Sequence, residues 1–182
     1  VRRDFRTLAG WWLPEVVARV AWFAVEQDIE PVFVTRWVRR HHLPGPDPAL
    51  AAWPWPLVLH GFGHFEATCD HRSLTHGGGK TAQRPLDLLR ALLAHGPGPL
   101  PVATVMNWLW PEADAAAQRK AFDVALLRLR RLLADPRLLH LDGGQLSLDE
   151  RWAWSDVGAL HALMQRIGSA HGAPLAQLQR WG

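Results

Sequence analysis

The sequence predicts a mixed α+β fold, and three patterns lead to that expectation. Residues 57–69 alternate apolar and polar side chains, as strands do. Residues 84–96 and 115–133 instead place apolar side chains at helical spacing. A second alternating stretch, residues 139–148, surrounds an Asp-Gly-Gly turn and predicts a β-hairpin.

Residues 1–42 are expected to form a helical hairpin. Val16, Val20 and Phe23 form an apolar stripe together with Ala24. A similar stripe recurs in residues 30–42, at Val34, Trp37 and Val38. Two short helices bury little on their own, so they either pack on the next domain or end a helical array. Val1 is not a methionine and no signal segment opens the chain, so we expect a piece of a longer protein.

Residues 43–56 predict a linker, because five prolines and one glycine in this stretch oppose regular structure. We expect Trp53 and Trp55 to anchor the linker to a surface rather than to stack on nucleic-acid bases. After the linker, residues 57–73 predict two or three antiparallel strands, with a hairpin turn at Asp70–Arg72.

The stretch LTHGGGKTAQR, residues 74–84, partly matches a phosphate-binding loop. Leu74 stands where that loop requires its first glycine. Proline is best tolerated in the first turn of a helix, so Pro85 predicts a helix that begins near Gln83 or Arg84 rather than at Lys80. We therefore interpret the stretch as the turn between the sheet and a helix, and we expect no nucleotide cofactor.

Three helices follow. The first, residues 84–96, has a buried stripe of Leu86, Leu89 and Leu93 and ends at Gly96. The second lies within residues 101–111, and the third spans about residues 115–133. Strands at 139–142 and 145–148 come next, and then a last helix with Ser155 as its N-cap. Three helices followed by a two-stranded wing predict a winged helix-turn-helix, in which the third helix enters the major groove of DNA.

Five segments carry a family resemblance: FGHFEA, RPLDLLRALLAHG, WLWPEAD, RLRRLL and GGQLSLD, in this order. They resemble the OmpR/PhoB-type winged helix-turn-helix DNA-binding domain, in the form found in bacterial transcriptional activators of the SARP and MalT-like kind. Residues 46–63 resemble the junction where such regulators pass from a helical-repeat region to a C-terminal DNA-binding domain. The resemblance implies an N-terminal antiparallel sheet, three helices, a wing and a larger parent protein.

The domain organisation expected from these patterns has four parts. Residues 1–42 are the helical hairpin, the end of a helical-repeat region, and residues 43–56 are the Pro/Trp-rich linker. Residues 57–150 are the winged helix-turn-helix domain, and residues 151–182 are a C-terminal helical extension.

The predicted helix at 115–133 divides into two faces at about 100° per residue. Phe122, Leu126, Leu129 and Leu133 fall on the core side, and Lys120, Val124, Leu127 and Arg131 fall opposite. The helix is locally basic, because Arg119, Lys120, Arg128, Arg130 and Arg131 stand against Asp123 alone. A solvated basic helix is the structural alternative to a nucleic-acid face.

Base readout is assigned to three of these residues. Arg128 suits the O6 and N7 atoms of guanine. Leu127 either contacts a thymine methyl group or rests under the wing or on a neighbouring molecule. Asp123 either accepts from cytosine N4 or orients Arg119. By position, the family's recognition-helix contacts fall on Lys120, Asp123, Val124, Leu127 and Arg128, and Arg119 and Arg131 complete the expected face.

Other predicted contacts lie outside this helix. Lys80 and Arg84 stand at a helix N-terminus, which favours a DNA phosphate or is merely solvated. The wing tip at Gly143, Gly144 and Gln145 lacks the cation that many family members insert into the minor groove. Glu112 and Asp114 form an acidic loop that, by analogy with the family, faces RNA polymerase.

Several function classes are not expected. The sequence contains no C-x-x-C, H-E-x-x-H or G-x-S-x-G motif, so we expect neither an enzyme nor a metal site. Its net charge of +3 is too small to indicate nucleic acid by itself, and no apolar run has the length of a membrane span. The single cysteine, Cys69, fits a reducing compartment, the cytoplasm.

The expected partners are double-stranded DNA, RNA polymerase and a second copy of the chain on DNA. The rival function is a protein-interaction module with a degenerate winged helix that no longer reads DNA.

Overall fold

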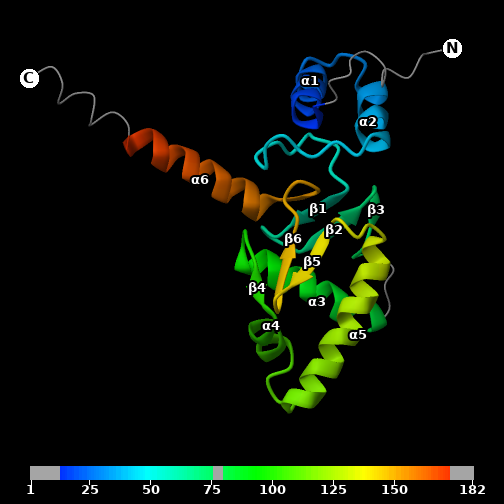
Figure 1. Cartoon of the computed structure of the whole chain (residues 1–182), viewed down its shortest axis with the longest axis vertical. Coiled ribbons are helices and arrows are strands. Elements are labelled where there is room, and N and C mark those ends of the chain that lie inside the picture. The colour runs from blue at the N-terminus through cyan, green and yellow to red at the C-terminus, as the bar shows by residue number, and fades with distance from the viewer. Residues whose placement is uncertain (1–12, 76–79, 173–182) are drawn as a thin grey trace, which may run out of the picture.

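The fold is mixed α+β, as the sequence predicts. A computed structural model describes residues 13–75 and 80–172 (Figure 1). Within these residues a helical hairpin lies at one end, and two small sheets and three helices form the body. A last helix, α6, projects from the side of the body (Figure 1).

The N-terminal hairpin consists of α1 (Pro14–Glu26) and α2 (Pro31–Arg40). Ala18 and Ala21 of α1 pack with Val34 and Val38 of α2 in a cluster of buried residues. The stripe expected on the first helix lies on the opposite side of α1: Val16, Val20 and Phe23 are exposed by 54%, 65% and 59%. The small alanines allow the close approach of α2 and the linker, so they form the inner face instead.

The segment at 43–56 contains no helix or strand, in line with its prolines. The predicted anchoring role of its tryptophans is confirmed, because Trp53 and Trp55 are each only 3% exposed and join the cluster beneath α1 and α2. Gly45 makes this possible: a Cβ atom there would lie 1.9 Å from the Trp55 ring. Trp154, far along the chain, completes the same cluster.

The first sheet has the strand order β3-β2-β1-β7. The strands β1 (Leu57–His60), β2 (Glu66–Cys69) and β3 (Arg72–Ser73) are antiparallel, as expected. Asp70 and His71 form the turn between β2 and β3 with φ angles of 46° and 64°. The fourth strand, β7 (Ala153–Ser155), pairs with β1 in parallel and was not anticipated.

The body continues with α3 (Lys80–His95), α4 (Val102–Leu109) and α5 (Ala115–Leu133). After them come β5 (Leu139–Asp142) and β6 (Gln145–Leu148), which pair as the predicted hairpin. A two-residue strand, β4 (Leu100–Pro101), adds to β6 and makes a second sheet. The leucines of α3, the inner face of α5 and Leu146 of β6 share one hydrophobic core.

The expected start of the first body helix is wrong. Helix α3 begins at Lys80 and contains Pro85 in its second turn. Proline removes one backbone donor this close to the N-terminus, while buried Leu86, Leu89 and Leu93 hold the rest of the helix against the core. Leu74 still argues against a phosphate-binding loop, because it stands where that loop requires its first glycine. Its side chain is buried, at 6% exposure, and its N–H donates to the carbonyl of Ala67.

The last helix, α6 (Asp156–Gly172), is fixed at its start. The predicted Ser155 cap is confirmed, since its Oγ accepts the N–H of Gly158 at 2.9 Å. The Asp156 carboxylate also accepts the N–H groups of Gly61 and Phe62 after β1. Further along α6, apolar side chains are exposed: Leu160, Leu163, Met164 and Ile167.

Candidate nucleic-acid interface

The outer face of α5 is basic, since Lys120, Arg128 and Arg131 are exposed on it. Helix α5 has the bounds that its periodicity predicts, and its predicted core residues Phe122, Leu126, Leu129 and Leu133 are buried. The residues expected on the opposite face are exposed: Lys120, Val124, Leu127, Arg128 and Arg131. The side chain of Leu127 is 51% exposed, so it does not rest under the hairpin in this structure.

An open hollow of about 380 Å³ lies beside this face. Helix α5 contributes Lys120, Val124 and Arg128, α3 contributes Arg84, and Trp110 closes one side. The remaining lining residues are small: Ala117, Ala121 and Ala125. The alanines leave the space, three cations surround it, and none of the described residues that line it is acidic. Such a surface attracts an anion.

Arg84 is held at the edge of this hollow by contacts with the end of α4. Its Nη1 donates to the carbonyl of Leu109 at 3.3 Å, and its guanidinium lies 5.9 Å from the centre of the Trp110 ring. Asp87 contributes a looser ion pair at 3.8 Å. Arg84 thus lies beside the outer face of α5, whereas the side chain of Lys80 lies outside the described residues.

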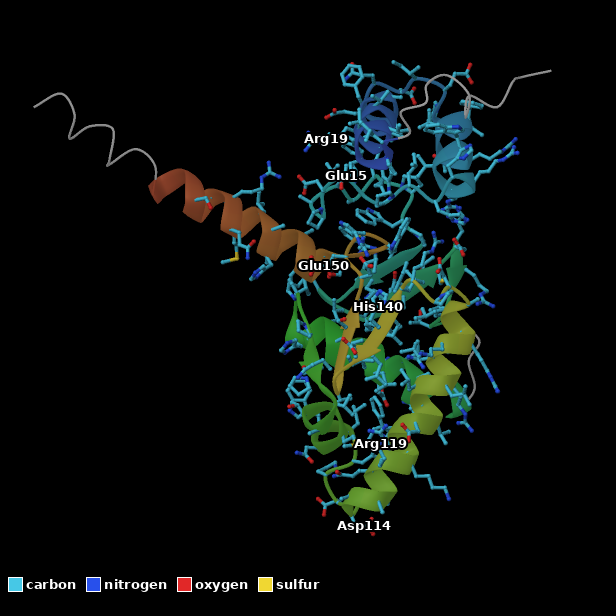
Figure 2. The ribbon with its side chains drawn as sticks, in the orientation of Figure 1. Glu15, Arg19, Asp114, Arg119, His140 and Glu150 are labelled. Atoms are coloured by element: carbon cyan, nitrogen blue, oxygen red, sulfur yellow. The ribbon has the colours of Figure 1, made fainter. Side chains whose placement is uncertain are left out.

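The turn before α5 contains the N-cap of that helix, which the sequence analysis did not predict. Asp114 is the N-cap of α5, because its carboxylate accepts the N–H of Ala117 at 2.8 Å. It stands at the end of the molecule farthest from α1 and α2 (Figure 2). An aspartate directly before an alanine-rich helical run is an N-cap signal and could have been recognised. Glu112 in the same turn is exposed.

Trp110 and Gln118 are two further residues that sequence reasoning did not select. The side chain of Gln118 is buried on α5, and its Nε2 donates to the carbonyl of Trp110 at 2.9 Å. This bond fixes the end of α4 against the first turn of α5. It thereby sets the position of the Trp110 ring beside the hollow.

Arg119, labelled in Figure 2, lies one helical turn before Asp123 on α5. The Nε of Arg119 donates to the carboxylate of Asp123 at 3.1 Å. Of the two roles considered for Asp123, this structure shows the pairing with Arg119. Both side chains are more than half exposed, so the pair contributes little to stability.

The tip of the β5–β6 hairpin is a two-residue turn. Gly143 and Gly144 have φ angles of 53° and 76°, which side chains rarely adopt and which explains the two glycines. The carbonyl of Gly144 accepts the N–H of Val102, so the tip is tied to the start of α4. The flanking residues Asp142 and Gln145 are exposed and carry no positive charge.

No protein-family model, curated protein or solved structure matches the chain, so the site rests on its own geometry. In the described residues, no helix has the length and apolar character needed to cross a membrane. No group of three or more His, Cys, Asp or Glu side chains converges there as metal ligands would.

Proposed function

We propose that the chain is a sequence-specific, double-stranded DNA-binding domain of a cytoplasmic bacterial transcriptional regulator, and not an enzyme. The observation that carries this proposal is the hollow on α5, which is lined by the cations Arg84, Lys120 and Arg128 and by the apolar side chains of Val124 and Trp110. Cations position a protein on DNA phosphates, and apolar and bidentate side chains distinguish the bases.

The arrangement of the body supports a winged helix-turn-helix. Helices α3, α4 and α5 are followed directly by the β5–β6 hairpin. In such domains the third helix lies in the major groove and the hairpin lies beside the adjacent backbone. The four-stranded sheet formed in part by residues 57–73 supports the OmpR/PhoB-type form, which the resemblance of the sequence segments first suggested.

Each element then has a role. Arg128 reads guanine, Val124 and Leu127 contact thymine methyl groups, and Lys120, Arg131 and Arg84 bind phosphates. The uncharged hairpin tip at Gly143–Gly144 approaches the backbone without entering the minor groove. Glu112 faces RNA polymerase, and a second copy occupies an adjacent half-site.

Selection of binding sequences from a random duplex pool tests the function. The wild-type chain should retain duplexes that share a common sequence. The charge reversal Lys120→Glu with Arg128→Glu should abolish retention, because it puts two carboxylates against the phosphates. Arg19→Glu with Arg36→Glu is the matched control, since both arginines are exposed on the N-terminal hairpin. Equal loss in both double variants would refute the α5 interface.

A second candidate function is a protein-interaction module. The exposed apolar side chains of α1 and α6 favour it, because single helices seldom present several such residues to water. Under this alternative the wild-type chain gives no gel shift with random-sequence duplex even at low salt. A shift that the α5 charge reversal removes would exclude it.

A further inference from the structure

The C-terminal end of α5 is closed by side chains from the first sheet. The last carbonyls of a helix have no N–H partner within the helix. Ala134, with a φ of 57°, donates its N–H to the carbonyl of Arg130. Four residues beyond Leu132 stands Pro136, which has no N–H to offer that carbonyl.

Arg72 supplies the missing donor. Its Nη2 donates to the carbonyl of Leu132 at 2.9 Å, and the thiol of Cys69 donates to the carbonyl of Leu133 at 3.4 Å. Burial raises the pKa of the Cys69 thiol to about 11, so the thiol keeps its proton at neutral pH. A guanidinium at this end is also favoured by the negative pole of the helix dipole.

Arg72 is placed there by the turn between β2 and β3. Asp70 and His71 reverse the chain in two residues, and Arg72 pairs with Cys69 across the turn. The two donors are thus neighbours on adjacent strands and reach consecutive carbonyls of α5. In Figure 1 the end of α5 lies beside β3.

We propose that Arg72 is a positioning residue for the DNA interface, which fixes the last two turns of α5 and thereby Arg128 and Arg131. This inference rests on the proposed function of α5. Arg128 and Arg131 both lie within six residues of the end of α5 at Leu133. Helix ends fray when their carbonyls are left without donors, and fraying would spread the two arginines over many orientations.

The hydrogen bond from Arg72 to the Leu132 carbonyl is called the clamp below. Hydrogen exchange of the free protein tests the clamp without DNA. Arg72→Met should accelerate exchange of the Leu133 and Ala134 amides by about fivefold, the effect of losing one hydrogen bond. Arg72→Lys, which can still donate, should restore most of the protection. Arg90→Met is the control, because Arg90 is exposed and donates to Asp87 on α3. Unchanged exchange in Arg72→Met would overturn the clamp.

A double-mutant cycle on DNA tests the positioning role. Arg72→Met alone should weaken binding by about three- to tenfold. In a background that carries both Arg128→Ala and Arg131→Ala it should weaken binding much less, because it acts through those two arginines. Independent, multiplicative losses would mean that Arg72 contacts DNA itself and would overturn the positioning role. Failure of the wild-type chain to bind any duplex would instead refute the proposed function, while the exchange result would still stand.

Discussion

Arg119 and Asp123 form an ion pair across one turn of α5, with the guanidinium Nε 3.1 Å from the carboxylate. The pair lies at the flank of the proposed interface and gives Asp123 a partner within the protein. Asp123 therefore restrains Arg119 in the free chain. This relationship separates the two roles considered for Asp123.

Asp123→Asn should strengthen binding to random-sequence duplex. The change releases Arg119 and removes a negative charge near the phosphates. We therefore expect the free energy of binding to become more favourable by about 0.5–1 kcal/mol at low salt, which is the size of an exposed ion-pair interaction. Fluorescence anisotropy measures it. A loss confined to duplexes with cytosine at one position would instead show that Asp123 accepts from a base.

Arg128→Ala should cost roughly 1–3 kcal/mol on a selected site and relax the preference at one base pair. Arg130→Ala is a close control, because it removes another exposed arginine side chain of α5. Arg130 stands two residues after Arg128 and therefore on a different side of the helix. Selection with each variant gives the base preferences. If the base preference at that position relaxes equally in both variants, α5 binds DNA through a different face from the one proposed.

Leu127→Ala should weaken binding only where the site presents a thymine methyl group near this residue. The side chain is exposed and so has room for an apolar partner. Replacing that thymine by uracil in the duplex removes the methyl group alone, and wild type and variant should then bind equally. If Leu127→Ala weakens binding to the uracil duplex as strongly as it weakens binding to the thymine duplex, Leu127 does not contact the thymine methyl group.

Gly45→Ala should destabilise the junction between the N-terminal hairpin and the body. A Cβ atom at this position would lie 1.9 Å from the buried Trp55 ring, so the tryptophan cluster must shift. We expect a cost of about 1–3 kcal/mol, as in other overpacked sites. Gly168→Ala on α6 is the control, since its Cβ would meet nothing within 4 Å. Thermal unfolding should show a lower Tm for Gly45→Ala only.

The sequence was most informative where one face of an element is consistently apolar. The bounds of α5 and of the β5–β6 hairpin follow from such patterns and from the Gly143–Gly144 turn. Strands β4 and β7 are too short to show a period, and β7 pairs with a strand almost one hundred residues earlier. Tertiary packing also overrode local rules, since α3 continues across Pro85 and α1 buries its alanines.

The candidate site was accessible to sequence reasoning only in part. Helical geometry identified the exposed side chains of α5, because they lie opposite an unambiguous core face. The hollow itself depends on Trp110 and on three alanines, and neither residue type signals a binding surface in a sequence. The clamp of Arg72 on Leu132 is equally hidden, because it joins residues 60 positions apart.

The salt dependence of DNA binding tests the central claim most directly. If the α5 face neutralises about four phosphates, log K should fall with log salt at a slope near −4. Arg131→Ala should reduce the magnitude of this slope by about one, and Arg36→Ala, an equal change of charge on α2, should leave it unchanged. Binding that does not depend on salt, or equal slopes for the wild type and Arg131→Ala, would contradict a DNA interface on α5.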